Sequence, residues 1–185
     1  EKHKNDNELC QNLKHWTEAC FLVTNIQNTT IDTNIIGVSL TNVLELKNHS
    51  QFYFSWLNIS RNPYIQNIQK KNDIPHYIGG PCDPNTPYVL LEIPISKFNI
   101  NDIIKSNIRV VIKNQSFVII FGQLNGVKIS LLETCSIMKV FWGIAGWSKT
   151  QLLGEIARGG WGVNKPIILN NLADDKLWNY FIENE

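Results

Sequence analysis

One stretch near the carboxyl end has the residue types of a phosphate-binding loop. Residues 143–150 read Gly-Ile-Ala-Gly-Trp-Ser-Lys-Thr, one residue away from the pattern Gly-x-x-x-x-Gly-Lys-Thr. In that pattern the backbone amides of the loop and the lysine hold phosphates, and the threonine hydroxyl binds magnesium. An apolar run precedes the stretch and a helix-forming segment follows it. This order of elements favours nucleotide binding.

Three features of the same stretch oppose nucleotide binding. Ser148 stands where the second glycine belongs, and its side chain resists the backbone conformation of a phosphate cradle. Trp147 puts a large ring inside the loop. The 185-residue chain ends 35 residues after Thr150, without an apolar strand that ends in aspartate to hold magnesium. We therefore interpret the stretch as a tight turn between a strand and a helix, and we predict no cofactor.

The other reactive side chains do not form a recognisable catalytic or metal site. Cys10, His15 and Cys20 are spaced by five residues, which is not a zinc-ligand spacing, so we predict no metal. His76 has no serine or cysteine partner in the sequence that would make a catalytic dyad. We interpret Cys82 as a small buried apolar residue rather than a reactive thiol. We predict no catalytic residues.

A series of short apolar and β-branched runs predicts the strands that position these residues. The runs occupy residues 20–26, 34–40, 74–78, 88–93, 108–112, 117–121, 140–145 and 167–169. Short polar segments join the first two runs and the pair at 108–121, which predicts two hairpins. The segment Asp83-Pro-Asn-Thr-Pro87 is a dense turn signal between strands.

Helix signals begin directly after residue 147. Ser148 is a good N-cap, and Gln151 three residues later would complete a capping box. We predict a helix over about 149–158, with one broad apolar face, ended by two glycines. The apolar positions are Leu152, Leu153, Ile156 and Ala157. We expect Trp147 and Trp161 to anchor this helix to the sheet.

The remaining segments give weaker signals. Residues 9–17 fit a short helix or an extended lead-in, and 128–138 fit a helix or a strand. We predict a final helix over 173–182. An aromatic cluster is interpreted as core packing against the sheet; its members are Phe52, Tyr53, Phe54, Trp56 and Leu57.

Length and composition are those of one globular domain. The chain has 185 residues, of which 43% are hydrophobic and 18% are charged. A formal net charge of +1 does not support nucleic-acid binding over the whole surface. The four scattered cysteines are typical of reduced intracellular thiols rather than a disulfide framework. No apolar run is long enough to span a bilayer. Because the chain starts at Glu1 and its single methionine is Met138, we expect the native amino terminus, and any targeting segment, to precede it.

The segment from residue 139 to 161 resembles the signature of the AlgH/YqgE family. That signature is an apolar strand, Gly-Tyr-Ala-Gly/Ser-Trp, then Gln-Leu, Glu-Ile and a closing Trp. The matching residues here are Gly143, Ala145, Gly146, Trp147, Gln151, Leu152, Glu155, Ile156 and Trp161. A Gly-Gly-Pro after a strand matches residues 79–81, and a closing Leu-Trp matches 177–178. The likeness covers about residues 20–182.

The resemblance implies a fold more readily than an activity. It implies a single α+β domain with a bifurcated, partly barrel-like mixed β-sheet flanked by helices. We expect an N-terminal lead-in over residues 1–19 and the AlgH/YqgE-like domain over 20–185. Members of the family are loosely called transcriptional regulators, and no reaction is established for them. The family's polar tip after the first hairpin is lost at residues 41–43.

We predict a non-enzymatic protein that acts by binding, as an accessory or structural subunit of a larger assembly with protein partners. The candidate surface residues are Gly79, Gly80, Pro81, Cys82, Asp83, Trp147, Lys149 and Gln151. The alternatives are a nucleotide- or nucleic-acid-responsive transcriptional regulator, or an enzyme with a site at the turns 79–87 and 143–148. We expect a soluble, intracellular protein without a membrane span, with a mitochondrion or plastid as one candidate compartment.

Overall fold

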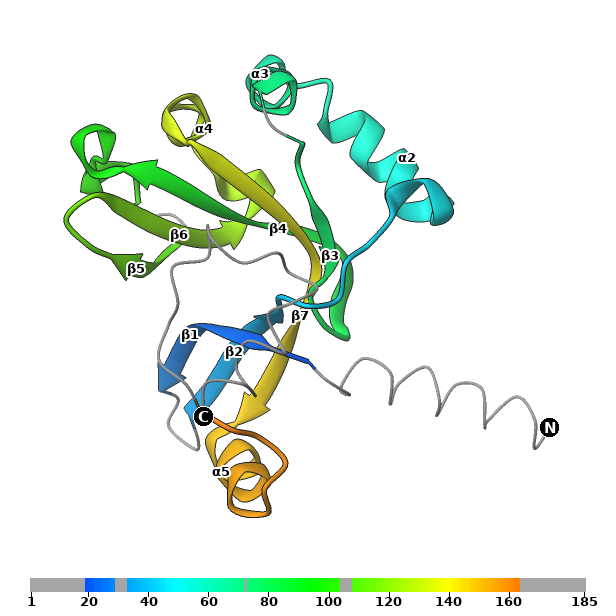
Figure 1. The fold of residues 1–185 in the computed structure, drawn as a ribbon, viewed down its shortest axis with the longest axis vertical. Coiled ribbons are helices and arrows are strands. Elements are labelled where there is room, and N and C mark those ends of the chain that lie inside the picture. Colours follow the sequence, from blue (N-terminus) through cyan, green and yellow to red (C-terminus); the bar gives the residue numbers. More distant parts are fainter. Residues whose placement is uncertain (1–18, 29–32, 72, 104–107, 164–185) are drawn as a thin grey trace.

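The computed structural model of the protein describes residues 19–28, 33–71, 73–103 and 108–163. Within these residues, seven strands form one sheet, shown in Figure 1. They are β1 (Phe21–Asn28), β2 (Thr33–Ser39), β3 (His76–Ile78), β4 (Cys82–Pro94), β5 (Arg109–Lys113), β6 (Phe117–Gln123) and β7 (Ile137–Ser148). The helices are α2 (Ser50–Ile59), α3 (Pro63–Lys71), α4 (Ile129–Thr134) and α5 (Lys149–Ala157). Short 3-10 turns occur at η1 (Leu46–Asn48), η2 (Ile95–Lys97), η3 (Ile100–Asp102) and η4 (Leu124–Gly126).

The sheet branches along β7. Its strand order is β1-β2-β7-β4-β6-β5, and β3 pairs in parallel with β7 off this path. The first half of β7 pairs with β4, while its last residues, 145–148, pair with β2. At the two ends of the order, β1 contacts β5, so the sheet curls towards a barrel. This confirms the predicted α+β domain with a bifurcated, partly barrel-like mixed sheet.

Two cores lie on the two faces of the central strands. Alternate residues of a strand point to opposite faces. Accordingly, Leu91 and Ile93 belong to a core with Trp56 and Leu131 from the helices, whereas Leu90 faces a second core. The second core also contains Val38, Tyr77, Phe121 and Phe141. Figure 1 shows α2, α3 and α4 gathered at one end of the molecule and α5 at the other.

The predicted aromatic cluster at residues 52–57 is only partly correct. These residues form α2, whose helical period turns Phe52 and Trp56 inwards onto Trp142 and His76. Tyr53, Phe54 and Leu57 are instead exposed. The prediction failed because it treated the cluster as one packed unit and did not recognise a helix with two faces.

Strands β4 and β7 decide two other predictions, those for residues 83–87 and 128–138. The predicted turn at 83–87 is wrong, because these residues belong to β4, which pairs irregularly with β7 between Cys82 and Pro87. Residues 128–138 contain both proposed structures, with α4 followed by the start of β7. The predicted elements at 9–17, 167–169 and 173–182 lie outside the described residues. The predicted boundary between residues 19 and 20 stays a prediction.

The described helices do not match the requirements of a bilayer span. Each one falls short of the length and apolar character that a membrane-crossing helix needs.

Candidate functional site

The predicted turn at 143–148 is wrong, because β7 continues through it. Ile35 and Ile36 of β2 stand opposite Trp147 and Gly146. Pairing with β2 gives partners to the backbone polar groups of residues 145–148 that point towards β2. Gly143 has φ +76°, a left-handed conformation that lets the strand bend where its partner changes from β4 to β2. The segment therefore has a strand's geometry rather than that of a phosphate cradle.

The glycines at 79, 80 and 143 allow two backbone segments to touch. A Cβ on Gly79 would collide with the Gly143 carbonyl oxygen, and one on Gly80 would collide with the backbone at Ile144. A Cβ on Gly143 would lie 2.5 Å from the Gly80 carbonyl oxygen and 2.8 Å from that of Cys82. Gly79 is buried and Gly80 is half-buried. Gly79 and Gly80, which were predicted as surface residues, therefore lie in a close contact between two backbone segments.

The residues after this contact are exposed. Pro81, Cys82 and Asp83 all face solvent, so the interpretation of Cys82 as a buried residue is wrong. The cause is the irregular start of β4, where Asp83 has φ +50°. The Tyr88 hydroxyl donates to Asp83 Oδ2 at 3.4 Å and accepts from Gln123 Nε2 at 3.3 Å. Burial raises the pKa of Tyr88, so this hydroxyl stays protonated.

Local signals fix both ends of α5. Ser148 Oγ accepts a hydrogen bond from the Gln151 backbone N–H at 3.0 Å, as the N-cap prediction required. The Gln151 side chain bonds Glu155 rather than returning to the cap. At the other end, Gly159 has φ +74°, its N–H donates to Ile156 O, and the Gly160 N–H donates to Glu155 O. This pair of bonds is the Schellman motif that the two glycines predict.

The predicted broad apolar face of α5 is only partly formed. Leu152 and Ile156 are half-buried, whereas Leu153 and Ala157 are exposed. None of the residues of α5 is fully buried. The helix lies over the end of β7 and β2, where the sheet offers a narrow apolar surface.

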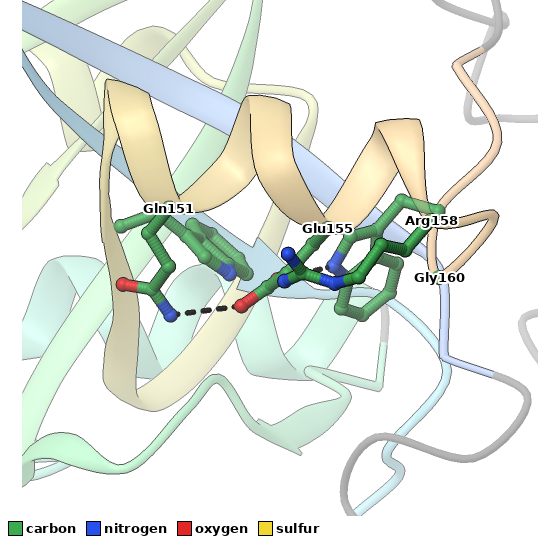
Figure 2. A pocket seen from close by; sticks show the side chains of 6 residues that line it. Gln151, Glu155, Arg158 and Gly160 are labelled. Atoms are coloured by element: carbon green, nitrogen blue, oxygen red, sulfur yellow. Dashed lines mark hydrogen bonds between the residues drawn. The ribbon is translucent and has the colours of Figure 1, made fainter.

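An open hollow of about 450 Å³ lies along α5 (Figure 2). Its polar side chains come from one side of the helix, because residues spaced by four and three share a face. Figure 2 shows Gln151, Glu155 and Arg158 in this row. The full lining is Trp147, Gln151, Glu155, Arg158, Gly160 and Trp161.

Glu155 organises the hollow. Its Oε2 accepts from the Trp161 indole N–H at 2.7 Å, and its Oε1 accepts from Gln151 Nε2 at 2.9 Å. These donors, that of Trp161 first, lower the pKa of the Glu155 carboxyl. The carboxylate is therefore ionised at neutral pH and holds the Trp161 ring in place.

Three aromatic rings brace one another beside the hollow. Phe21 of β1 meets the rings of Trp147 and Trp161 edge to face, with centroids 5.2 and 5.6 Å away. The two indoles are themselves 6.2 Å apart and nearly perpendicular. Trp147 is buried and Trp161 is half-buried. Edge-to-face contacts of this kind add to the burial energy of the rings, so both indoles are rigid parts of the wall.

A second polar cluster is fully internal. His76 Nδ1 accepts a hydrogen bond from the Trp142 indole N–H at 3.2 Å, and the Trp56 ring packs edge-on at 4.5 Å. Burial lowers the pKa of His76 to about 4, so the imidazole is neutral. Among the described residues, no three His, Cys, Asp or Glu side chains are grouped closely enough to hold a metal ion.

The sequence of residues 29–184 matches the family model described as AlgH-like, DUF179. The chain belongs to the AlgH-like family. The resemblance seen at residues 139–161 is thereby confirmed.

Individual relatives of this AlgH-like chain are distant. A UPF0301 protein of Parabacteroides distasonis is 28% identical over 117 residues, which are 62% of this chain and 54% of that protein. The chain thus spans about half the length of this curated relative. The X-ray structure of protein DIP2367 from Corynebacterium diphtheriae aligns with a TM-score of 0.57 at 17% identity, over 90% of this chain and 77% of that one. At this identity, the two proteins are alike in their fold alone.

A solution structure of the AlgH protein from Pseudomonas aeruginosa is also similar. It aligns with a TM-score of 0.46 at 14% identity, over 90% of this chain and 88% of that one.

The AlgH-like signature and the predicted site overlap at the hollow. Trp147 and Gln151 line it, whereas Lys149 is exposed and lies outside the lining, as do residues 79–83. Site prediction missed Glu155, Arg158, Gly160 and Trp161. The spacing of Gln151, Glu155 and Arg158 by four and three residues was a usable signal, because it places all three on one face of a helix.

Proposed function

We propose that this AlgH-like protein acts by binding, without a chemical step, as an accessory or structural subunit of a larger protein assembly. The hollow on α5 is its contact site. One observation carries the proposal: two braced indole rings and an exposed Arg158 guanidinium share one open hollow. The Arg158 side chain is exposed, and its positive charge also helps to lower the pKa of the Glu155 carboxyl.

The chemistry of the hollow suits protein recognition. Tryptophan and arginine are enriched at the residues that dominate binding energy in protein interfaces. Rings that are already held by neighbours lose little conformational freedom when a partner docks. An acidic or aromatic side chain of the partner would meet the Arg158 guanidinium above the indole wall.

The same hollow is poorly suited to acid–base catalysis. A general base works best with a pKa near the working pH, whereas the pKa of Glu155 is shifted downwards. Both of its carboxylate oxygens already accept hydrogen bonds from Trp161 and Gln151. The carboxylate therefore supports the wall of the hollow rather than a proton transfer.

The test is quantitative affinity purification of the tagged full-length protein from the cells that make it. We expect the wild type to run above monomer size with a reproducible set of protein partners. Arg158→Glu reverses the charge at the mouth of the hollow, and we expect it to reduce partner recovery by about tenfold or more. A wild-type protein that runs only as a monomer would contradict the proposal.

A matched control lies on the opposite side of α5. Leu153 is 53% exposed, outside the hollow, and two residues from both Gln151 and Glu155. Leu153→Ser should therefore leave partner recovery unchanged. Circular dichroism of both variants shows whether the fold is kept. If Arg158→Glu retains all partners while its fold is intact, the hollow is not the contact site.

A further inference from the structure

The outer face of α2 exposes an unusual amount of apolar surface. Phe54 is 64% exposed, Leu57 is 41% exposed and Tyr53 is 37% exposed. Among the described residues, each of the other helices and strands carries at most two large apolar side chains that are this exposed. Gathered apolar side chains at a surface mark contact sites, whereas single ones need no explanation.

Helix α2 carries apolar side chains on both its inner and its outer face. Phe52 and Trp56 face inwards, where the Phe52 ring lies 5.0 Å from Trp142. Residues 54 and 57 lie about half a turn away from these positions, on the outer side. Helix α2 has no charged residue over its ten positions, Ser50–Ile59. A solvated outer face would normally carry charges.

Basic residues lie near both ends of α2, with one acidic residue beside the first of them. Lys47 precedes the helix in η1, Arg61 follows its last residue by two positions, and both are exposed. Over residues 41–70 the single acidic residue is Glu45, whose carboxylate accepts a hydrogen bond from the Asn48 side chain. The segment around the apolar stripe therefore has a net positive charge, because Lys47, Arg61 and Lys70 outnumber Glu45 over residues 41–70.

This charge arrangement disfavours a second copy of the chain as the occupant. In a two-fold symmetric dimer the same patch meets itself. Antiparallel pairing of two α2 helices would place Lys47 near Arg61, and parallel pairing would place each basic residue near its own copy. Antiparallel pairing would also place Glu45 near Arg61, but in both arrangements two surfaces of net positive charge would meet. A partner with acidic groups at both ends would instead gain attraction at each of them.

We propose that the outer face of α2 docks an acidic amphipathic helix of another protein. The apolar stripe of that helix covers Tyr53, Phe54 and Leu57, and its acidic residues pair with Lys47 and Arg61. Because α2 spans about 15 Å, a partner helix of about three turns matches its length. A partner helix that buries one apolar face uses anchors at positions i, i+3 or i+4, and i+7. This surface is separate from the hollow on α5.

The test uses a displayed library of twenty-residue helical peptides selected against the full-length protein. We expect the recovered peptides to share an apolar stripe flanked by aspartate or glutamate. A synthetic peptide carrying that consensus should bind the wild type in fluorescence anisotropy, and the double variant Phe54→Ser/Leu57→Ser should weaken it at least tenfold. Raising the salt from 0.05 to 0.5 M should weaken it several-fold, because exposed charges are screened.

Variants separate this proposal from the one above. Arg61→Glu should weaken the acidic peptide and, in a repeated selection, favour peptides with lysine or arginine at the corresponding end. Ile129→Ser, which removes an exposed apolar side chain from α4, and Arg158→Glu should both leave the peptide affinity unchanged.

Four outcomes would overturn the proposal. These are a selection that recovers no consensus, a consensus without acidic residues, a peptide that still binds the double variant, and a wild-type dimer in sedimentation that the double variant abolishes. Binding to vesicles with an anionic lipid surface, lost in the double variant and without a matching peptide, would assign the face to a membrane instead.

Discussion

A few polar side chains of this protein are buried, and a few apolar side chains are exposed. His76 is the clearest internal case, because its imidazole is 6% exposed and accepts a hydrogen bond from the indole of Trp142. Protonation of Nδ1 would turn this acceptor into a donor that faces another donor. The hydrogen bond therefore requires the neutral imidazole. The contribution of His76 to the free energy of unfolding then depends on pH.

His76 should make the protein less stable as the pH falls. Burial lowers its folded pKa to about 4 from 6.5, so the unfolded chain takes up the proton first as the solution is acidified. Stability is thus present above pH 6.5 and is lost between about pH 6.5 and 4, by roughly 3 kcal/mol if this group acts alone. The measurement is urea unfolding of the wild type and His76→Asn, whose amide oxygen can accept from Trp142 without titrating.

The difference between the two proteins isolates His76 from other titrating groups. We expect the wild type to be more stable at pH 7 and the gap to narrow by roughly 3 kcal/mol towards pH 4. Parallel pH profiles for the two proteins would show that His76 is not the group responsible.

Residue types alone predicted the local features around α5 well. The N-cap at Ser148 and the glycine ending at 159–160 both follow from backbone chemistry within a few residues. The pairing of His76 with Trp142 could not be predicted, because 66 residues separate them and only the parallel strands β3 and β7 bring them together. The lining of the hollow by Trp161 likewise depends on its bond to Glu155.

At the scale of elements, β7 decides most of the architecture. Its twelve residues pair with β4, β3 and β2 in turn. The sequence indicated a strand only as far as residue 145, because glycine and the Ser-Lys-Thr motif are usual signs of a turn. The structure instead uses Gly143 as a bend within a continuous strand. The helix α2 was missed for a related reason, since its aromatic residues obscure the helical period.

The bend at Gly143 should be intolerant of any side chain. Alanine there would need a left-handed backbone, and its Cβ would press on the carbonyl oxygens of Gly80 and Cys82, which are backbone atoms that cannot rotate away. We expect Gly143→Ala to lower the free energy of unfolding by roughly 3 kcal/mol or more. Urea unfolding followed by tryptophan fluorescence measures this loss.

Gly146 provides the matched control within the same strand. It is exposed, and a Cβ built on it meets no atom within 4 Å. Gly146→Ala should therefore change stability by no more than about 0.5 kcal/mol. Equal effects of the two substitutions would mean that the close backbone contact at Gly143 does not contribute to the fold.

At the scale of the whole molecule, the central strands of the sheet are more deeply buried than its edges. Residues 88–93 of β4, the inner strand β6 and the first half of β7 are largely buried. The edge strand β1 has exposed Val23 and Ile26, and α5 has no fully buried residue. The fold class and the bifurcated sheet followed from the family resemblance, but the strands that pair along β7 follow from long-range contacts that no local pattern encodes.

Hydrogen exchange should reveal this gradient. Amides of β4, β6 and residues 138–142 should exchange most slowly, because opening them requires loss of the main core. Amides of β1, β5 and α5 should exchange faster by about tenfold or more, through partial opening at the edges. Mass spectrometry of peptic peptides measures both groups in one experiment. Protection of β1 and α5 equal to that of β4 would contradict the gradient.

One consequence of β7 concerns the distance between the two ends of the molecule. Trp142 packs against Phe52 of α2. Trp147, five residues further along the same strand, lines the hollow on α5. An extended strand advances about 3.3 Å per residue, so these two anchor points are at most about 16 Å apart, because the strand bends at Gly143. Strand β7 would therefore set the distance between one molecule bound at α2 and another bound at α5. Lengthening β7 by two residues would change the distance between these two molecules without altering either binding surface.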